Sequence, residues 1–307
     1  MSRIAAIFVL LVLLAAARAV AGLGKYADLV VADSAGAAPR AGVRITYLGT
    51  NAYLLEARGV MLLVDPYFSR VSLWRMALNL RAAPQPDTIA RHLGARRIDG
   101  ILVTHGHCDH LLDVPAIMRG TRAKLFASRT SMQLVESCGI APGRCVPVTG
   151  GSVVRIGGAT VRVFSVKHDR LFGRVPFDEA PRRLPPRRLG DWVCGEPLAF
   201  LIEMGGQRIY LESGGQPGLP PTIRGPVDLA ILGVALPDAR ARFPGLLAAL
   251  QPRYVLPSHQ DNFFRPLDRG FAFGPLTDFP AVRRAFAAQH SRTRLILLDY
   301  EKAWTLR

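Results

Sequence analysis

The sequence predicts one α/β domain in which two β-sheets pack face to face and helices cover their outer faces. Two observations carry this prediction. Short apolar runs with β-type spacing come in two batches, and helical patterns punctuate each batch. No Gly/Ser-rich or charged linker divides the batches, and half of the 307 residues are hydrophobic, which is typical of a folded chain.

The N-terminus has the pattern of a cleaved signal peptide. Arg3 precedes an uninterrupted apolar run at 4–17, and Ala19-Val20-Ala21 offers a small-x-small cleavage site. A run of this length falls short of the roughly 30 Å hydrocarbon core of a membrane. We therefore predict a signal peptide at 1–21 and an exported protein, periplasmic or secreted. An uncleaved N-terminal membrane anchor is the alternative.

A weakly structured linker or N-terminal extension is expected at 22–42, followed by the domain at 43–307. Within the domain, strands are expected at 43–48, 52–57, 60–64, 101–104, 153–156, 161–166, 198–203, 207–211, 228–234 and 253–257, with a final hairpin at 294–299 and 302–306. Helices are expected at 109–118, 130–137, 239–250 and 279–290. The segment 171–192 is rich in Pro and Arg, and its Pro density predicts a long surface loop.

The strongest chemical signal is His105-Gly106-His107-Cys108-Asp109-His110. Three imidazoles and a carboxylate lie within six residues, in a chain with only seven histidines. Both groups are zinc ligands. Where a strand ends and a helix begins, His105 and His107 can point one way while Asp109 and His110 point another. That geometry can serve two metals a few ångströms apart.

This segment resembles the His-x-His-x-Asp-His signature of the metallo-β-lactamase superfamily at every defined position, and the resemblance extends over roughly 43–307. It implies a four-layer αββα sandwich with two mixed β-sheets flanked by helices. It also implies that His168 is the third ligand of the first metal and that His259 is the last ligand. Asp65 resembles the early strand-end aspartate that supports ligands from behind.

One position departs from the superfamily pattern. The family carries a metal-bridging Asp in a Gly-Asp-Thr-like turn, which falls near Gly214 here, in the run Glu212-Ser213-Gly214-Gly215. Glu212 could replace it only if the turn shifted or the longer side chain reached across. Otherwise the second site is expected to bind weakly or stay empty. We therefore expect one or two Zn²⁺ ions, with zinc favoured by the His-rich ligand set and by family habit.

The resemblance implies a hydrolase in which a metal-activated water attacks an ester, lactone or phosphodiester. Asp109 would orient the water or bind a second metal. No Gly-x-Ser-x-Gly elbow is present, which argues against a serine hydrolase. Cys108 could act as a nucleophile or soft ligand, but we favour an inert thiol that points into the fold.

The loop after His168 is expected to form the rim of the site. Its arginines, interspersed with apolar side chains, suit an anionic or amphiphilic small molecule or lipid. Such a loop could also contact a membrane surface. The alternative is a loop whose arginines simply face solvent. These arginines are Arg182, Arg183, Arg187 and Arg188. Within the superfamily, the chain looks closer to lactonases and N-acylphosphatidylethanolamine phospholipase D-like members. The cues are the Leu-Leu-Asp after His110 and the segment 258–264.

The formal net charge of +16 favours anionic partners, although arginines dispersed over the surface would give the same value. Nucleic acid is not expected, because the protein is predicted to be exported.

Two rival functions stay open: a non-catalytic or metal-binding degenerate member, and a β-lactam or thioester hydrolase. Cys138 and Cys145 bracket a short loop and could form a disulfide. The sequence decides neither that bond nor the oligomeric state.

Overall fold

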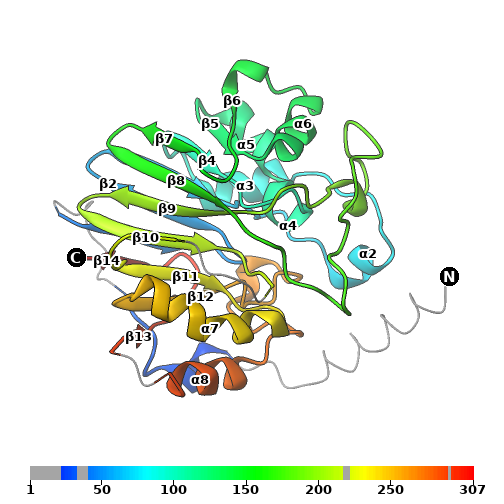
Figure 1. Ribbon diagram of the computed structural model, residues 1–307. Helices are drawn as coiled ribbons and strands as arrows, with labels where there is room; N and C mark the ends of the chain where they lie inside the picture. Colours follow the sequence, from blue (N-terminus) through cyan, green and yellow to red (C-terminus); the bar gives the residue numbers. More distant parts are fainter. Residues whose placement is uncertain (1–21, 33–40, 217–221, 290–291) are drawn as a thin grey trace.

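The computed structural model describes residues 22–32, 41–216, 222–289 and 292–307. The expected signal peptide at 1–21 lies outside the described residues. In the described ranges, two seven-stranded mixed sheets pack against each other, with helices on both outer sides (Figure 1). The predicted four-layer αββα sandwich is confirmed.

The first sheet has the order β14-β1-β2-β3-β4-β5-β6. Its strands are β1 (Val43–Tyr47), β2 (Tyr53–Ala57), β3 (Val60–Val64), β4 (Gly100–Leu102), β5 (Lys124–Ala127), β6 (Cys145–Pro147) and β14 (Ala303–Leu306). Pairing is antiparallel from β14 to β3 and parallel from β3 to β6.

The second sheet has the order β13-β12-β11-β10-β9-β8-β7. Its strands are β7 (Val153–Ile156), β8 (Ala159–Ser165), β9 (Leu198–Met204), β10 (Gln207–Glu212), β11 (Leu229–Gly233), β12 (Tyr254–Ser258) and β13 (Arg294–Leu295). Pairing is antiparallel from β7 to β10 and parallel from β10 to β13. The parallel strands therefore end at a common edge, where loops can gather side chains into a site.

Helices cover both outer faces (Figure 1). On the first sheet lie α3 (Pro86–Leu93), α4 (Cys108–Leu111), α5 (Val114–Gly120) and α6 (Arg129–Ser137), and on the second lie α7 (Pro237–Leu250) and α8 (Phe279–Ala287). Short elements complete the described parts: α2 (Leu73–Ala77) and the 3₁₀ turns η1 (Leu23–Tyr26), η2 (Pro142–Arg144), η3 (Leu189–Asp191) and η4 (Leu267–Arg269).

Apolar alternation explains why the strands bury both faces. Tyr53 and Leu55 of β2 belong to the core between the sheets, whereas Leu54 belongs to the core under α3–α6. Successive side chains of a strand point to opposite faces, so a strand that is buried on both sides needs apolar residues at nearly every position. This is why the β-type runs could be read from the sequence.

The expectations about the elements were wrong or incomplete in three respects. The final hairpin does not form, because β13 joins β12 in the second sheet while β14 pairs with β1 in the first. The helix expected at 109–118 is broken into α4 and α5, with Pro115 in the first turn of α5. The strands β5 and β6 and the helices α2 and α3 were not predicted.

Residues 22–32, expected to be part of a linker, include a packed 3₁₀ turn. The buried ring of Tyr26 meets Phe273 and Phe279 edge-on, with centroid distances of 5.4 and 4.7 Å. This aromatic cluster ties the described part of the segment to α8. Among the described residues, no helix has the length and apolar character needed to cross a membrane.

The disulfide considered between Cys138 and Cys145 does not form, and all four cysteines are free. The connection between α6 and β6 is fixed in another way. The Arg144 guanidinium donates hydrogen bonds to the carbonyls of Met118, Thr121 and Ala123 at 2.6, 2.9 and 2.6 Å. Cys145 is buried in β6, and burial raises the pKa of its thiol to about 11.

Candidate metal centre

Five strand ends meet at one edge of the sandwich and supply the candidate ligands and two side chains beside them. Asp65 follows β3, and the 105–110 segment follows β4. From the second sheet, His168 follows β8, Ser213 follows β10, and His259 follows β12. The fold thus brings together all six residues that the sequence predicted as metal ligands, and they form two groups.

The first group, called the three-histidine group, consists of His105, His107 and His168. His105 Nε2 lies 2.9 Å from His107 Nδ1 and 3.2 Å from His168 Nε2. Burial, together with the neighbouring histidines, lowers the pKa of His107 to about 3 and holds that of His105 well below its usual range. Burial also lowers the pKa of His168 to about 4. All three rings are therefore neutral at pH 7.

The outer nitrogen of each of these rings has a hydrogen-bond partner, which for His105 Nδ1 is the Thr104 hydroxyl oxygen at 3.1 Å. His107 Nε2 donates to the Pro176 carbonyl at 2.8 Å, and His168 Nδ1 donates to the Asp169 carbonyl at 2.7 Å. A carbonyl can only accept, so the inner nitrogens of His107 and His168 carry lone pairs rather than protons.

Lone pairs that face one another inside a buried site repel unless a cation lies between them. The donor set of the three-histidine group, with each outer nitrogen fixed by the protein, is the arrangement that metal-binding histidines have. The residues present therefore fit a metal ion of the zinc type.

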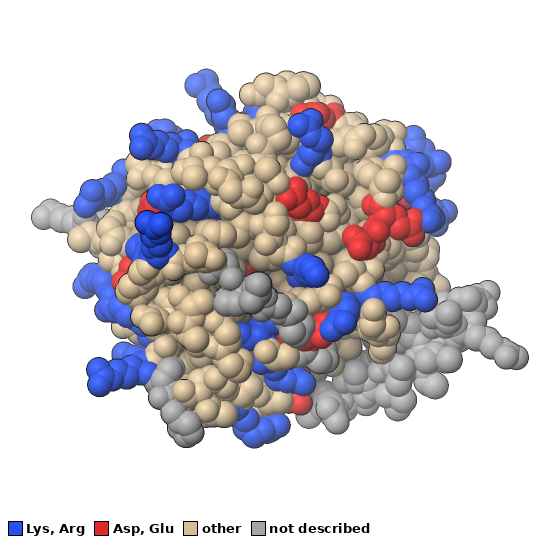
Figure 2. Space-filling view, in the orientation of Figure 1, with Lys and Arg blue, Asp and Glu red and all other residues tan. Residues whose placement is uncertain are grey.

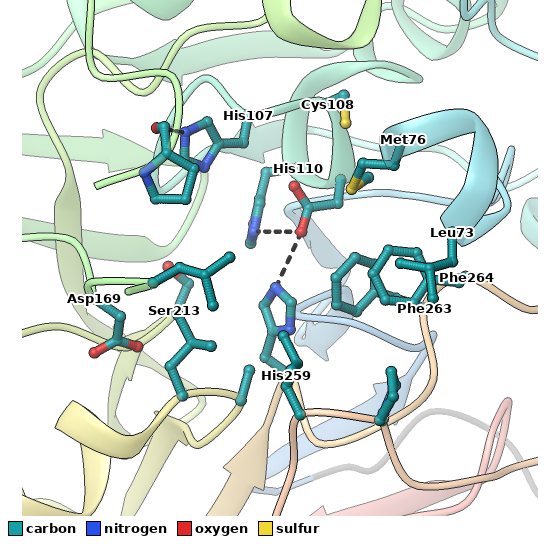
Figure 3. A pocket seen from close by; sticks show the side chains of 18 of the residues that line it. Leu73, Met76, His107, Cys108, His110, Asp169, Ser213, His259, Phe263 and Phe264 are labelled. Carbon is teal, nitrogen blue, oxygen red and sulfur yellow. Dashed lines mark hydrogen bonds and ion pairs between the residues drawn. The ribbon is translucent and has the colours of Figure 1, made fainter. Parts of the chain in front are cut away.

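The second group, called the mixed group, consists of Asp109, His110 and His259. One oxygen of Asp109 lies 3.1 Å from His259 Nε2 and 3.5 Å from His110 Nε2 (Figure 3). Burial lowers the pKa of His110, but the carboxylates of Asp109 and Asp65 outweigh it and raise the pKa to about 10. His259 Nδ1 is buried and has no hydrogen-bond partner among the described residues.

Asp65 lies behind both groups and is completely buried. Its carboxylate accepts hydrogen bonds from the Thr104 backbone and hydroxyl at 2.7 and 2.6 Å, from Asn51 Nδ2 at 2.7 Å, and from His110 Nδ1 at 2.9 Å. Asp65 thereby fixes the end of β4 and the ring of His110. Asp65 thus holds candidate ligands from behind.

A family model described as a β-lactamase superfamily domain matches residues 61–242, more than half of the chain. The chain belongs to the β-lactamase superfamily. It is similar to a UPF0173 metal-dependent hydrolase of Carboxydothermus hydrogenoformans, with 27% identity over 232 residues that cover 72% of this chain and 86% of the relative. A UPF0173 metal-dependent hydrolase of Rubrobacter xylanophilus is 29% identical over 231 residues, covering 72% and 83%.

Solved structures of the superfamily share the fold. The metallo hydrolase Igni18 of Ignicoccus hospitalis superposes with a TM-score of 0.57 at 17% identity, covering 86% of this chain and 98% of that one. The metallo-β-lactamase fold protein YhfI of Bacillus subtilis gives a TM-score of 0.55 at 12% identity, covering 85% and 99%. The lactonase and phospholipase D-like branch stays a prediction, because none of these names carries a substrate.

The turn where the superfamily resemblance places a bridging aspartate has no room for a side chain. Gly214 has a φ of +124°, a conformation that L side chains rarely adopt, and a Cβ there would overlap Oδ2 of Asp169. Asp169 is buried, and its Oδ1 accepts a hydrogen bond from Gly215 N–H at 2.8 Å. Burial raises the pKa of Asp169 well above its usual range, against the lowering effect of Arg242.

Glu212, considered as a replacement for that aspartate, lies outside both groups. Its carboxylate accepts a hydrogen bond from the Tyr210 hydroxyl at 2.8 Å and pairs with Arg242 of α7 at 2.6 Å. Tyr210 and Glu212 are two residues apart on β10, so they share the face that packs under α7. The alternation of the strand, which the spacing argument overlooked, turns Glu212 away from the histidines.

The two groups lie in the wall of a cavity of about 350 Å³. None of the four loop arginines, Arg182, Arg183, Arg187 and Arg188, lines it, and all four are exposed. The four arginines therefore do not form the wall of this cavity, to which the loop contributes Leu171, Pro176 and Phe177, and a cationic rim farther out stays a prediction. Arginines and lysines are scattered over the face shown in Figure 2, with acidic residues among them.

Phe177, an apolar residue of the loop expected at the rim, does line the cavity, whereas the sequence did not point to four other lining residues: Leu73, Met76, Asp169 and Ser213. Ser213 Oγ lies 3.4 Å from His105 Nδ1. Only Asp169, next to His168, had a signal in the sequence, because a carboxylate beside a predicted ligand is a candidate for the same site. Cys108 is buried, and burial together with Asp109 raises the pKa of its thiol, which favours the inert role.

Proposed function

We propose that this protein is an exported, zinc-dependent hydrolase that cleaves an ester, lactone or phosphodiester. At the coarser level the chain is a metal-dependent hydrolase of the β-lactamase superfamily, and its relatives are named as such. The observation that supports the finer proposal most is the convergence of three neutral imidazoles, each with a fixed outer nitrogen, beside a cavity that can admit a small molecule.

Zinc in a site of this type polarises the substrate and acidifies a water. The chain's own residues do the rest. The carbonyls of Pro176 and Asp169 hold two imidazoles in the tautomer that presents a lone pair inward. Asp109 offers a carboxylate at the boundary of the two groups, where it can orient the attacking water or accept its proton. The apolar walls of the cavity exclude other water molecules and strengthen these electrostatic contacts.

The binding preference for the three-histidine group follows from the turn at Gly214. Without a bridging carboxylate no protein ligand joins the two groups, so we expect the first ion to bind at His105, His107 and His168. A second ion at the mixed group would be held more weakly. This same feature is what favours the second candidate function, a metal-binding member of the superfamily that has lost turnover.

A substrate panel tests the hydrolase proposal. Zinc-loaded mature protein is assayed on a simple ester, a lactone, a phosphodiester, a thioester and a β-lactam, beside chelator-treated protein and a His107→Ala variant. We expect hydrolysis of at least one of the first three, its loss on chelation, its return with added zinc, and no turnover by the variant. Zinc binding with no hydrolysis of the panel would favour the non-catalytic alternative.

Export is tested separately. Expression of the full chain in a Gram-negative host, followed by fractionation and mass spectrometry of the N-terminus, should give a periplasmic protein that begins at Gly22. Recovery of the intact N-terminus with the membrane fraction would favour the uncleaved anchor.

A further inference from the structure

The cavity beside the two ligand groups has an apolar end that metal binding does not explain. Leu73 and Met76 of α2 face Phe263 and Phe264, from the segment after β12, across this end (Figure 3). We call these four residues the apolar pocket. The ring of Phe263 stands edge-on to His259 with centroids 4.8 Å apart, and it also lies 4.2 Å from the ring of Phe264. The apolar pocket is therefore continuous with the mixed group.

The charges around the cavity argue against an anionic ligand there. No Lys or Arg among the described residues lines it; its acidic lining residues are Asp109, Asp169 and Asp261, and the protonated His110 already lies beside Asp109. Asp261 is fully buried and already paired with Arg70 at 2.7 Å and with the Tyr300 hydroxyl at 2.6 Å. A carboxylate or phosphate pushed into this end would lose its water without meeting a cation, which is costly. An uncharged hydrocarbon group has no such hydration to lose on entering this end of the cavity.

The size of the cavity limits the ligand further. A volume of about 350 Å³ is near the lower end for small-molecule sites, which hold roughly 300–1,000 Å³. One hydrocarbon chain of medium length fits such a space beside a reacting carbonyl, whereas the two chains of a diacyl lipid do not.

We propose that the apolar pocket binds the single, uncharged acyl chain of the substrate, so that the protein acts on medium-chain acyl esters or lactones. This inference rests on the proposed hydrolase function and gives it a substrate class. Hydrolysis breaks the acyl C–O bond, places the hydroxyl of water on the acyl carbon, and delivers the proton to the leaving alkoxide. With its chain among Leu73, Met76, Phe263 and Phe264, the substrate presents its carbonyl beside Asp109, at the boundary between the mixed group and the three-histidine group.

Two exposed apolar side chains are sequence neighbours of residues that line the cavity. Trp74, which follows Leu73 on α2, is 59% exposed, and Phe172, which follows Leu171 on the loop, is 64% exposed. An acyl substrate could arrive here from water or from a membrane surface, and the chemistry of the chain is the same in both cases. The experiment therefore includes both sources.

The test is a homologous series of nitrophenyl esters from acetyl to decanoyl, with zinc-loaded protein. Each methylene buried in the pocket should raise kcat/KM about fourfold until the pocket is full. Ala77→Phe, which fills the cavity from α2, should lower the ratio of decanoyl to acetyl turnover at least tenfold. Leu78→Ala, at the residue that follows α2 and outside the cavity lining, is the control and should keep the ratio. A flat series would overturn the proposal.

Binding without turnover separates this inference from the proposed function. Calorimetry with metal-free protein should show that decanol binds more tightly than hexanol, and that Ala77→Phe removes the difference. If decanol binds in this way but no ester is hydrolysed, the pocket stands and the hydrolase proposal fails. If acetyl and decanoyl esters turn over equally and decanol does not bind, the hydrolase stands and the pocket proposal fails.

Supplying the ester in two forms distinguishes substrate that comes from water from substrate that comes from a membrane. Decanoyl ester is offered free in solution and then within phosphatidylcholine vesicles, to the unchanged protein and to Trp74→Ala. If the substrate comes from a membrane, vesicles should raise the rate and Trp74→Ala should remove the gain. If it comes from water, the free ester should be the better substrate and the variant should behave as the unchanged protein does.

Discussion

The three-histidine group and the mixed group lie side by side, with the ring centroids of His105 and His110 4.1 Å apart. They differ in the partners that the protein itself provides for their ligand atoms. The mixed group contains an anion, Asp109, which hydrogen-bonds His259 and lies near His110. The three-histidine group contains no anion, and its inner lone pairs face one another. The three-histidine group therefore depends on a bound cation. In the mixed group, the carboxylate of Asp109 already provides a partner for the two histidines.

The largest effect should come from comparing one histidine of each group. His168→Ala removes a ligand of the three-histidine group, so we expect loss of tightly bound zinc and a fall in hydrolysis to background. His259→Ala should keep that zinc and lose only part of the rate. The measurements are kcat/KM on the best ester and zinc per chain. If both variants are equally inactive and metal-free, the two groups act as one unit and the comparison fails.

Asp65 connects the groups from behind, and Asp65→Asn tests how far each depends on it. Because His110 loses the carboxylate that fixes its ring, zinc affinity of the mixed group should fall about 10- to 100-fold. The three-histidine group should change less, since Asp65 reaches it only through Thr104. Zinc titration by calorimetry measures both. Asp268→Asn, in an exposed pair with Arg91, is the control and should leave both affinities unchanged.

Glu212→Ala separates stability from metal binding. The variant leaves Arg242 buried without its partner, which should lower the free energy of unfolding by about 3–5 kcal/mol. Zinc per chain should not change, because Glu212 faces α7. Denaturant unfolding measures the loss of stability, and elemental analysis measures the zinc content. Asp268→Ala should cost about 1 kcal/mol or less. Loss of zinc on Glu212→Ala would show that Glu212 reaches the metals after all.

Gly214→Asp introduces the aspartate of the superfamily pattern and tests whether the second ion depends on that residue. The positive φ and the overlap with Asp169 should cost about 1–3 kcal/mol of stability, and the variant should gain no second ion. Combining it with Asp169→Gly opens the space, so the double variant should recover stability and hold two ions. Thermal unfolding and zinc content follow both changes. A second tight ion in the single variant would mean that Asp169 moves aside easily.

The sequence predicted the layers and the ligands because both signals are local. A buried β-strand shows as a short apolar run, and four of the six candidate ligands lie within 105–110. His168 and His259 were placed by the superfamily resemblance, which has ligands after strands in this order, and the fold brings them to the same edge. Such inferences need no knowledge of which strands pair.

The features that the sequence did not reveal depend on contacts between distant segments. Asp169 fills the space beside Gly214, and the apolar pocket combines α2 with the segment after β12. The two final strands lie next to each other in sequence but join different sheets. Period and propensity carry no information about such pairings, since the same apolar run can bury itself against many partners.

Zinc content per chain of the mature protein, measured by elemental analysis beside His107→Ala and His259→Ala, tests the central claim most directly. We predict one tightly bound zinc in the unchanged protein, its loss in His107→Ala, and its retention in His259→Ala. Zinc that stays in His107→Ala and leaves in His259→Ala would contradict the claim that the three-histidine group is the metal site on which hydrolysis depends.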